Sequence, residues 1–163
     1  MARVSRFTRP ATRMLVLVAM VACGDVTAPL ANTAYLLHTV NGEPLPAIID
    51  SARAPGVNLD FRIVGRTLEF LGPDSVQYAE ASDVVEPLPD GSLKLVQSSC
   101  ESVKASYNLA GRQLVVRIPP NRVLGTPLRN DTLTTFGRDS LVQIHDGLRL
   151  TFSPGRPDVP LCG

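Results

Sequence analysis

The stretch SVKASYNLAGRQLVVRI, residues 102–118, decides the fold. Apolar and polar side chains alternate in both of its halves, and the Ala110-Gly111 pair between them is typical of a turn. The apolar positions are Val103, Ala105, Tyr107 and Leu109 in the first half and Leu114, Val116 and Ile118 in the second. A period of two places these side chains on one face of an extended chain. The stretch therefore predicts two antiparallel strands with a shared buried face.

The same period continues on both sides of this hairpin. It predicts further strands at residues 34–40, 59–71, 75–85, 92–100, 131–136, 140–145 and 148–153, whereas residues 47–53 fit either a strand or one helical turn. Asn41-Gly42 and Asp146-Gly147 are strong turn pairs, and Gly65 indicates a bulge or tight turn. No amphipathic helix longer than two turns is expected. The pattern favours an all-β sandwich or barrel, and the sequential hairpins favour an antiparallel up-and-down meander barrel of about eight strands.

Charge is distributed unevenly along the 163 residues. The whole chain carries a formal net charge of +1, but Arg3, Arg6, Arg9 and Arg13 all precede the first acidic residue. Removal of residues 1–22 takes away these four arginines and no acid, which changes the net charge to −3. A mildly acidic remainder argues against a nucleic-acid partner, which requires a basic surface.

The N-terminal residues have the organisation of an export signal. The four arginines are followed by the apolar run MLVLVAMVA, residues 14–22, which is too short for the roughly 20 apolar residues of a transmembrane helix. The sequence at the end of this run, Val21-Ala22-Cys23, resembles the lipobox of bacterial lipoproteins. That resemblance implies cleavage before Cys23, attachment of lipid to its sulfur, and membrane anchoring. The Gly24 that follows implies the outer membrane as the default location.

An ordinary signal peptidase site after Ala28 is the alternative, and it would discard Cys23. Pro29 opposes it, because proline directly after the cut is poorly tolerated. The lipoprotein interpretation divides the chain into a signal peptide (1–22), a lipidated Cys23 with a flexible tether (23–33), and a single β-barrel domain (34–163). The bacterial envelope membrane is then the expected partner, through the lipid.

If Cys23 carries lipid, Cys100 and Cys162 remain as an even pair in an exported chain. A disulfide between them is the expected arrangement. Neither cysteine belongs to a C-x-x-C motif or lies near a histidine at metal-ligand spacing, so a catalytic or metal-binding thiol is the weaker alternative.

Residues 34–153 also resemble small bacterial lipoproteins with a lipocalin-like barrel. The resemblance rests on YLLHTVNGEPLP at residues 35–46, on the strand pairs RTLEF…VQY and SYNLAGRQL, and on a closing hairpin that ends in GLRLTF at residues 147–152. It implies a fold, and it brings no catalytic residues with it.

Chemical motifs are sparse. His38 and His145 are the only histidines, and no nucleophile elbow, zinc, P-loop or dinucleotide motif is present. His145-Asp146 could be a base with its orienting acid, but Asp-Gly is first a turn pair. Asp83, Glu86, Asp131 and Asp139 are expected to be solvated. No enzyme activity, metal or cofactor is expected.

A non-catalytic module that binds a small apolar ligand is therefore the expected function, and an envelope interaction protein without a ligand is the alternative. A small barrel can bind one small apolar ligand, and the candidate lining residues are aromatic: Tyr35, Phe61, Phe70, Tyr78, Tyr107, Phe136 and Phe152. The same residues equally suit a filled core, in an envelope protein that acts through its exterior. An open interior favours the first function, and a packed interior favours the second.

Overall fold

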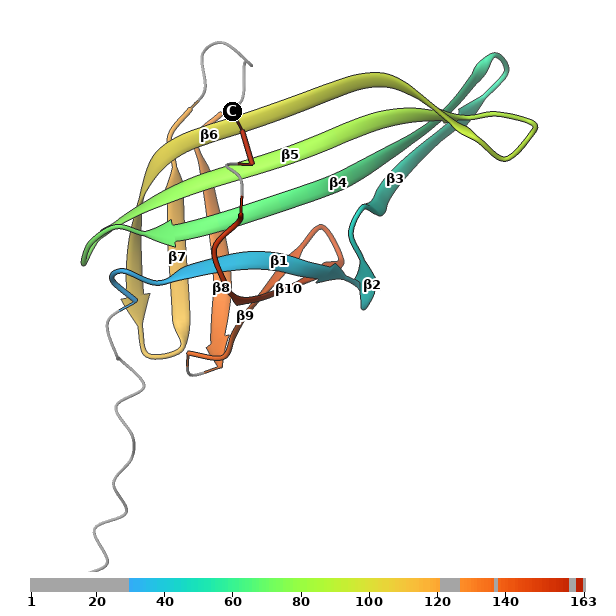
Figure 1. Ribbon diagram of the computed structural model, residues 1–163. Helices are drawn as coiled ribbons and strands as arrows, with labels where there is room; N and C mark the ends of the chain where they lie inside the picture. The colour runs from blue at the N-terminus through green and yellow to red at the C-terminus, as the bar shows by residue number, and fades with distance from the viewer. Residues whose placement is uncertain (1–29, 121–126, 137, 159–160, 163) are drawn as a thin grey trace, which may run out of the picture.

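A computed structural model describes residues 30–120, 127–136, 138–158 and 161–162, and these residues form an all-β protein (Figure 1). Its strands are β1 (Ala34–Val40), β2 (Glu43–Pro44), β3 (Ala47–Ala54), β4 (Val57–Phe70), β5 (Ser75–Pro87), β6 (Leu93–Ala110), β7 (Gln113–Ile118), β8 (Arg129–Phe136), β9 (Ser140–His145) and β10 (Leu148–Pro154). The described part of the chain contains no helix that could span a membrane. The all-β prediction is confirmed.

Eight of the strands close into an antiparallel barrel. Each strand from β4 to β10 pairs with the next in the sequence, and β1 pairs with β10 on one side and with β4 on the other. The closing contact is short, since it joins residues 34–36 to residues 67–69. This up-and-down order confirms the predicted meander barrel. Closure removes the exposed edges that an open sheet would carry.

The hairpin that decided the fold is present as predicted. β6 pairs with β7 around Ala110 and Gly111, and Tyr107 lies opposite Val116. Ala105, Leu114, Val116 and Ile118 are buried, whereas the intervening positions are more exposed. The Asp146-Gly147 turn is also present, and both residues have the positive φ values (49° and 81°) that a tight hairpin requires.

The strands β4, β5 and β6 are longer than predicted. Residues 92–100 and 102–109 were expected to form two strands, but they belong to the single strand β6. The same three strands continue past the barrel and, with β3 beside β4, form a projecting four-stranded sheet, which we call the arm (Figure 1). Residues 47–54 are therefore a strand and not a helical turn.

A β-bulge marks the transition from barrel to arm. The register of β4 on β5 shifts between Ile63 and Gly65, which confirms the irregularity predicted at this glycine. Bulges increase local twist and bend a strand. The bulge therefore lies where β4 leaves the curved wall of the barrel and enters the arm.

The chain enters the barrel earlier than predicted. Residues 30–33 were expected to belong to the flexible tether, but the side chain of Leu30 is 3% exposed and packs in the core. The backbone N–H of Asn32 donates to the carbonyl of Phe70, and the N–H of Phe70 donates to the carbonyl of Thr33. An apolar side chain at the open end of a barrel gains free energy by covering the core, which explains the difference.

Candidate functional site: the barrel interior and its clasp

Aromatic rings fill the end of the barrel that Leu30 covers. Phe70 packs edge-on against Tyr35 and Tyr107, with ring centroids 6.0 and 4.8 Å apart. The hydroxyl groups reach the barrel rim, where Tyr35 donates to the carbonyl of Arg138 at 3.2 Å and Tyr107 donates to that of Gly72 at 2.8 Å. Phe152 is fully buried beside them. This arrangement is a packed core whose polar atoms are satisfied at its edge.

Charged side chains cross the interior nearer the arm. Arg66 on β4 donates to Gln143 on β9 at 2.8 Å and forms an ion pair with Glu80 on β5 at 2.6 Å. The Tyr78 hydroxyl donates to Glu80 and accepts a hydrogen bond from Arg129 on β8 at 2.6 Å. We call this group, with Asp131, the ionic cross-link. It joins the neighbouring strands β4 and β5 to the neighbouring strands β8 and β9, which lie elsewhere in the barrel wall.

Two arginines enclose the ring of Tyr78. The guanidinium carbons of Arg66 and Arg129 lie 5.7 and 5.2 Å from the ring centroid, within the range of cation–π attraction. Arg129 Nε lies 3.0 Å from Asp131 Oδ1, at ion-pair distance but without hydrogen-bond alignment. Asp131 is 4% exposed, so the expectation that this acid is solvated is wrong. The strand register places it on the interior face, where Arg129 compensates its charge.

The pKa values of the ionic cross-link follow from burial and pairing. Burial alone would raise the pKa of Glu80, but Arg66, the Tyr78 hydroxyl and Arg129 outweigh it and hold the pKa below its usual value. Burial raises the pKa of Tyr78 far above its ordinary range. Burial opposes the charge of Arg129, but Tyr78, Asp131 and Glu80 raise its pKa overall. At neutral pH the interior therefore holds paired charges.

The seven predicted lining residues occupy different environments. Tyr35, Phe70, Tyr78, Tyr107 and Phe152 are buried in the core cluster. Phe61 is partly buried on the arm, opposite Val84. Phe136, at the end of β8, is 47% exposed and lies outside the group. The structure thus brings five of these aromatic side chains together.

Sequence reasoning missed the polar members of the interior. Arg66 precedes Leu68 by two positions, and Glu80 follows Tyr78 by two, so alternation alone places both on the buried face. The register on β8 similarly places Asp131 on the face of Leu133. The signal was present, but charged residues are rarely buried, which favoured a solvated interpretation.

A disulfide attaches the C-terminal segment to the outside of the barrel. Cys100 and Cys162 are bonded, with their Cα atoms 5.7 Å apart, as predicted. The described part of this segment (residues 155–158 and 161–162) is called the strap, and it crosses β4 and β5 toward β6 (Figure 1). A Cβ on Gly65 would lie only 2.7 Å from Leu161 Cδ1. The glycine therefore provides the space that the strap occupies.

The two histidines form no catalytic arrangement with described residues. His145 Nε2 lies 3.5 Å from Asp146 Oδ2, but the Asp146 side chain is 88% exposed in the hairpin turn. His38 is exposed on β1. Within the described ranges, no three histidine, cysteine or acidic side chains are grouped so that they could hold a metal ion. Cys23 lies outside the described residues.

Three described pockets lie on the outer surface. One of about 630 Å³ lies beside β6 and β7, with Lys104, Arg117 and Asp74 in its wall. A second, of about 240 Å³, lies beneath the strap next to Arg156 and Leu161. A third, of about 330 Å³, lies on the arm next to Leu95 and Val96. These three pockets offer space to a partner on the outside of the molecule.

Comparison with known proteins gives no assignment: no family model, curated protein or solved structure matches this chain.

Proposed function

We propose that this chain is an exported lipoprotein of the bacterial cell envelope, anchored through Cys23, whose barrel is a non-catalytic scaffold for protein interaction. The observation that carries the proposal is the occupied interior. Aromatic side chains fill one end, and the ionic cross-link spans the other. A small apolar ligand is the competing function, and it would have to displace this packing or lie against paired charges, which is costly.

The entry of the chain into the barrel supports anchoring at one end of the molecule. Leu30 lies at the Phe70 end of β4, whereas the arm extends from the Val57 end. Six residues lie between Cys23 and Leu30, and the seven steps from one Cα atom to the other span at most about 25 Å when the chain is extended. A lipid on Cys23 would hold the end of the barrel that Leu30 covers near the bilayer. The arm would then point away from the bilayer.

Metabolic labelling tests the anchor. The full chain, expressed in a Gram-negative host with an alkyne analogue of palmitate, is expected to incorporate label and to fractionate with membranes. Cys23→Ser should lose both properties, whereas Cys162→Ser should retain the label. Unlabelled wild-type protein with a new N-terminus at Pro29 would instead establish the ordinary signal peptidase site.

Analysis of bound small molecules tests the filled interior. The purified full chain is extracted with organic solvent, and the extract is analysed by mass spectrometry. We expect no small apolar molecule in stoichiometric amount. A stoichiometric ligand, retained by the Cys23→Ser variant and lost when Phe152→Ala opens the core, would overturn the filled-scaffold proposal in favour of ligand binding.

A further inference from the structure

Two hairpin turns lie side by side at the end of the barrel that Leu30 covers. The chain turns from β6 into β7 next to Arg112, and from β8 into β9 next to Arg138. The N–H of Thr135 donates to the carbonyl of Arg112 at 2.8 Å, and the hydroxyl of Tyr35 donates to the carbonyl of Arg138 at 3.2 Å. These hydrogen bonds attach both turns to the barrel, so the side chains on them have defined positions.

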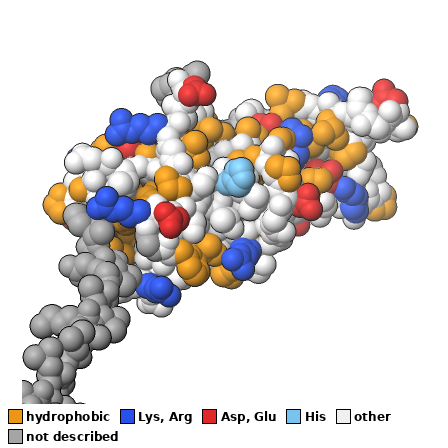
Figure 2. Space-filling view, turned by 60° about the horizontal axis from the view of Figure 1, so that its bottom comes forward, with side chains coloured by type: hydrophobic (Ala, Val, Ile, Leu, Met, Phe, Trp, Pro, Cys, Tyr) orange, Lys and Arg blue, Asp and Glu red, His pale blue; other side chains and the backbone are white. Residues whose placement is uncertain are grey.

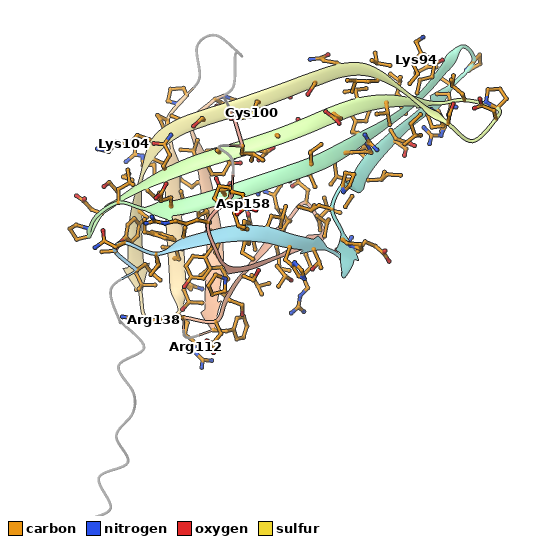
Figure 3. All side chains as sticks on the ribbon, in the orientation of Figure 1. Lys94, Cys100, Lys104, Arg112, Arg138 and Asp158 are labelled. Atoms are coloured by element: carbon orange, nitrogen blue, oxygen red, sulfur yellow. A yellow bond between two sulfur atoms is a disulfide. The ribbon has the colours of Figure 1, made fainter. Side chains whose placement is uncertain are left out.

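The two turns present one aromatic and two basic side chains to the outside. Phe136, at the end of β8, is 47% exposed, and the side chains of Arg112 and Arg138 are exposed as well. We call these three residues the basal patch. Figure 3 shows both arginines at the end of the molecule opposite Lys94, which lies on the arm. Figure 2, in which this end comes forward, shows basic and hydrophobic side chains close to the start of the described chain.

The described residues do not neutralise the basic side chains of the basal patch. Neither Arg112 nor Arg138 forms an ion pair with any of them. Asp139 is the one acidic residue in these two turns, so positive charge is in excess there. Asp74, in the turn between β4 and β5, lies in the wall of the pocket that also contains Lys104. The basal patch can therefore bind an anionic surface without giving up an ion pair.

The chain reaches the barrel at the same end. Leu30 packs in the core there, and the short tether keeps this end within about 25 Å of a lipid on Cys23. Aromatic side chains enter the boundary between headgroups and acyl chains, and basic side chains attract anionic lipids. The basal patch thus has the chemistry of a membrane contact and lies where the proposed anchor would bring the bilayer.

We propose that the basal patch docks directly on a bilayer surface that contains anionic phospholipid. Phe136 enters the headgroup boundary, and Arg112 and Arg138 bind lipid phosphates. The lipid on Cys23 supplies most of the affinity, whereas the basal patch fixes the angle at which the barrel and the arm stand on the membrane. This inference deepens the proposed anchoring and rests on it.

A bilayer fits the basal patch better than a protein partner does. Three side chains offer too little area for a stable protein interface, which buries about 1,000 Å² or more. A bilayer contact needs no such area, because the lipid on Cys23 would already hold the two surfaces together at a high effective concentration. The short tether therefore favours the membrane as the occupant.

Fluorescence quenching in nanodiscs tests the docking. The chain contains no tryptophan, so Phe136→Trp places a single reporter in the basal patch. Ile144→Trp and Leu95→Trp place matched reporters on the side of the barrel and on the arm, at residues that are 65% and 58% exposed. Each variant is expressed as the full chain, purified from membranes in its lipidated form, and reconstituted with phospholipids brominated on their acyl chains. We expect bromine to quench the reporter at position 136 and not the other two, more strongly in anionic than in zwitterionic lipid.

Charge reversal tests the two arginines. In the Phe136→Trp background, Arg112→Glu with Arg138→Glu should lower the equilibrium constant for docking about tenfold or more, because each basic side chain near an anionic surface contributes about fivefold. Lys104→Glu with Arg149→Glu makes the same change in net charge at exposed residues outside the basal patch and should be quenched as the parent is. Circular dichroism confirms that each variant is folded.

A second measurement separates the docking from the anchor. If metabolic labelling shows no lipid on Cys23, the protein released with Pro29 at its N-terminus is mixed with vesicles. The emission of the reporter at position 136 should then shift to shorter wavelength with anionic vesicles only, a result that would overturn the anchor and support the docking. In labelled protein, an unquenched reporter at position 136 would overturn the docking and leave the anchor in place.

Three further results would overturn the docking. The first is equal quenching at positions 136, 144 and 95, which would show that no end of the molecule prefers the bilayer. The second is an equal loss of quenching in the two charge-reversal variants. The third is an emission shift at position 136 that grows with protein concentration in the absence of lipid, which would assign the basal patch to a second copy of the chain.

Discussion

Arg66 shows how one residue can connect distant parts of a barrel. Its side chain is 7% exposed, and its guanidinium contacts both Glu80 and Gln143. Buried charges are costly to desolvate, so their value depends on complete pairing. Removal of one partner leaves the other uncompensated, which makes the ionic cross-link sensitive to single substitutions.

Arg66→Ala should lower the free energy of unfolding by about 3–5 kcal/mol, the usual cost of breaking a buried ion pair. Glu80 would then retain only Arg129, at 3.9 Å, and the Tyr78 hydroxyl. Urea unfolding measures the change. The double variant Arg66→Met with Glu80→Gln should recover part of the loss, because it leaves no unpaired charge. A loss below about 1 kcal/mol for Arg66→Ala would contradict the role given to this pair.

The lowered pKa of Glu80 predicts how stability depends on pH. The unfolded chain takes up a proton near the ordinary value of 4.5, whereas the folded chain does so only at lower pH. The contribution of the ionised carboxylate is therefore complete above about pH 4.5 and is lost as the pH falls through the folded pKa. Unfolding measured from pH 3 to 6 should show a smaller acid loss in Glu80→Gln than in the parent. Parallel curves would contradict the prediction.

At the scale of elements, the strap depends on a small residue beneath it. Leu161 covers Gly65, and the disulfide fixes the next residue to β6. Strap and bulge thus meet at the junction of barrel and arm. A larger side chain at position 65 would therefore displace the strap and not the interior side chains.

Gly65→Val should displace the strap and destabilise the protein by about 1–3 kcal/mol, the usual cost of overpacking. The added Cβ would overlap sterically with Leu161 Cδ1, only 2.7 Å away. Faster proteolysis of the C-terminal segment reports the displacement. The double variant Gly65→Val with Leu161→Ala should recover much of the parent stability. If the double variant is as unstable as Gly65→Val alone, the added side chain overlaps with a residue other than Leu161.

The disulfide acts on the whole molecule, since it links residues 62 positions apart. Cys100→Ser with Cys162→Ser should lower the free energy of unfolding by about 2–4 kcal/mol, mainly through the unfolded chain. The barrel itself is closed by the β1 pairings, so its circular dichroism spectrum should persist. Loss of the β-sheet spectrum at room temperature would show that closure of the barrel depends on the disulfide.

The strands of the barrel could be predicted from the sequence more fully than the side chains that fill its interior. Alternation and turn pairs determine strands locally, which is why the hairpin of β6 and β7 could be predicted from residues 102–118 alone. The arm was not predicted, because Gly65 indicates only a local irregularity in one strand and does not show that the strands continue beyond the barrel. Asp131 was expected to be solvated because charged residues are rarely buried, although alternation on β8 places it on the face of Leu133 and beside Arg129.

The position of β1 also affects the order in which the chain can fold. β1 is the first strand, yet Leu37 pairs with Phe152 near the end of the chain. During synthesis, most of one edge of β1 remains without its neighbour until β10 emerges. Until β10 is available, the unpaired edge of β1 can pair with a wrong strand. For this protein, the risk of wrong strand pairing is therefore greatest between the emergence of β1 and that of β10, and a chaperone that binds unfolded chains should matter most in that interval.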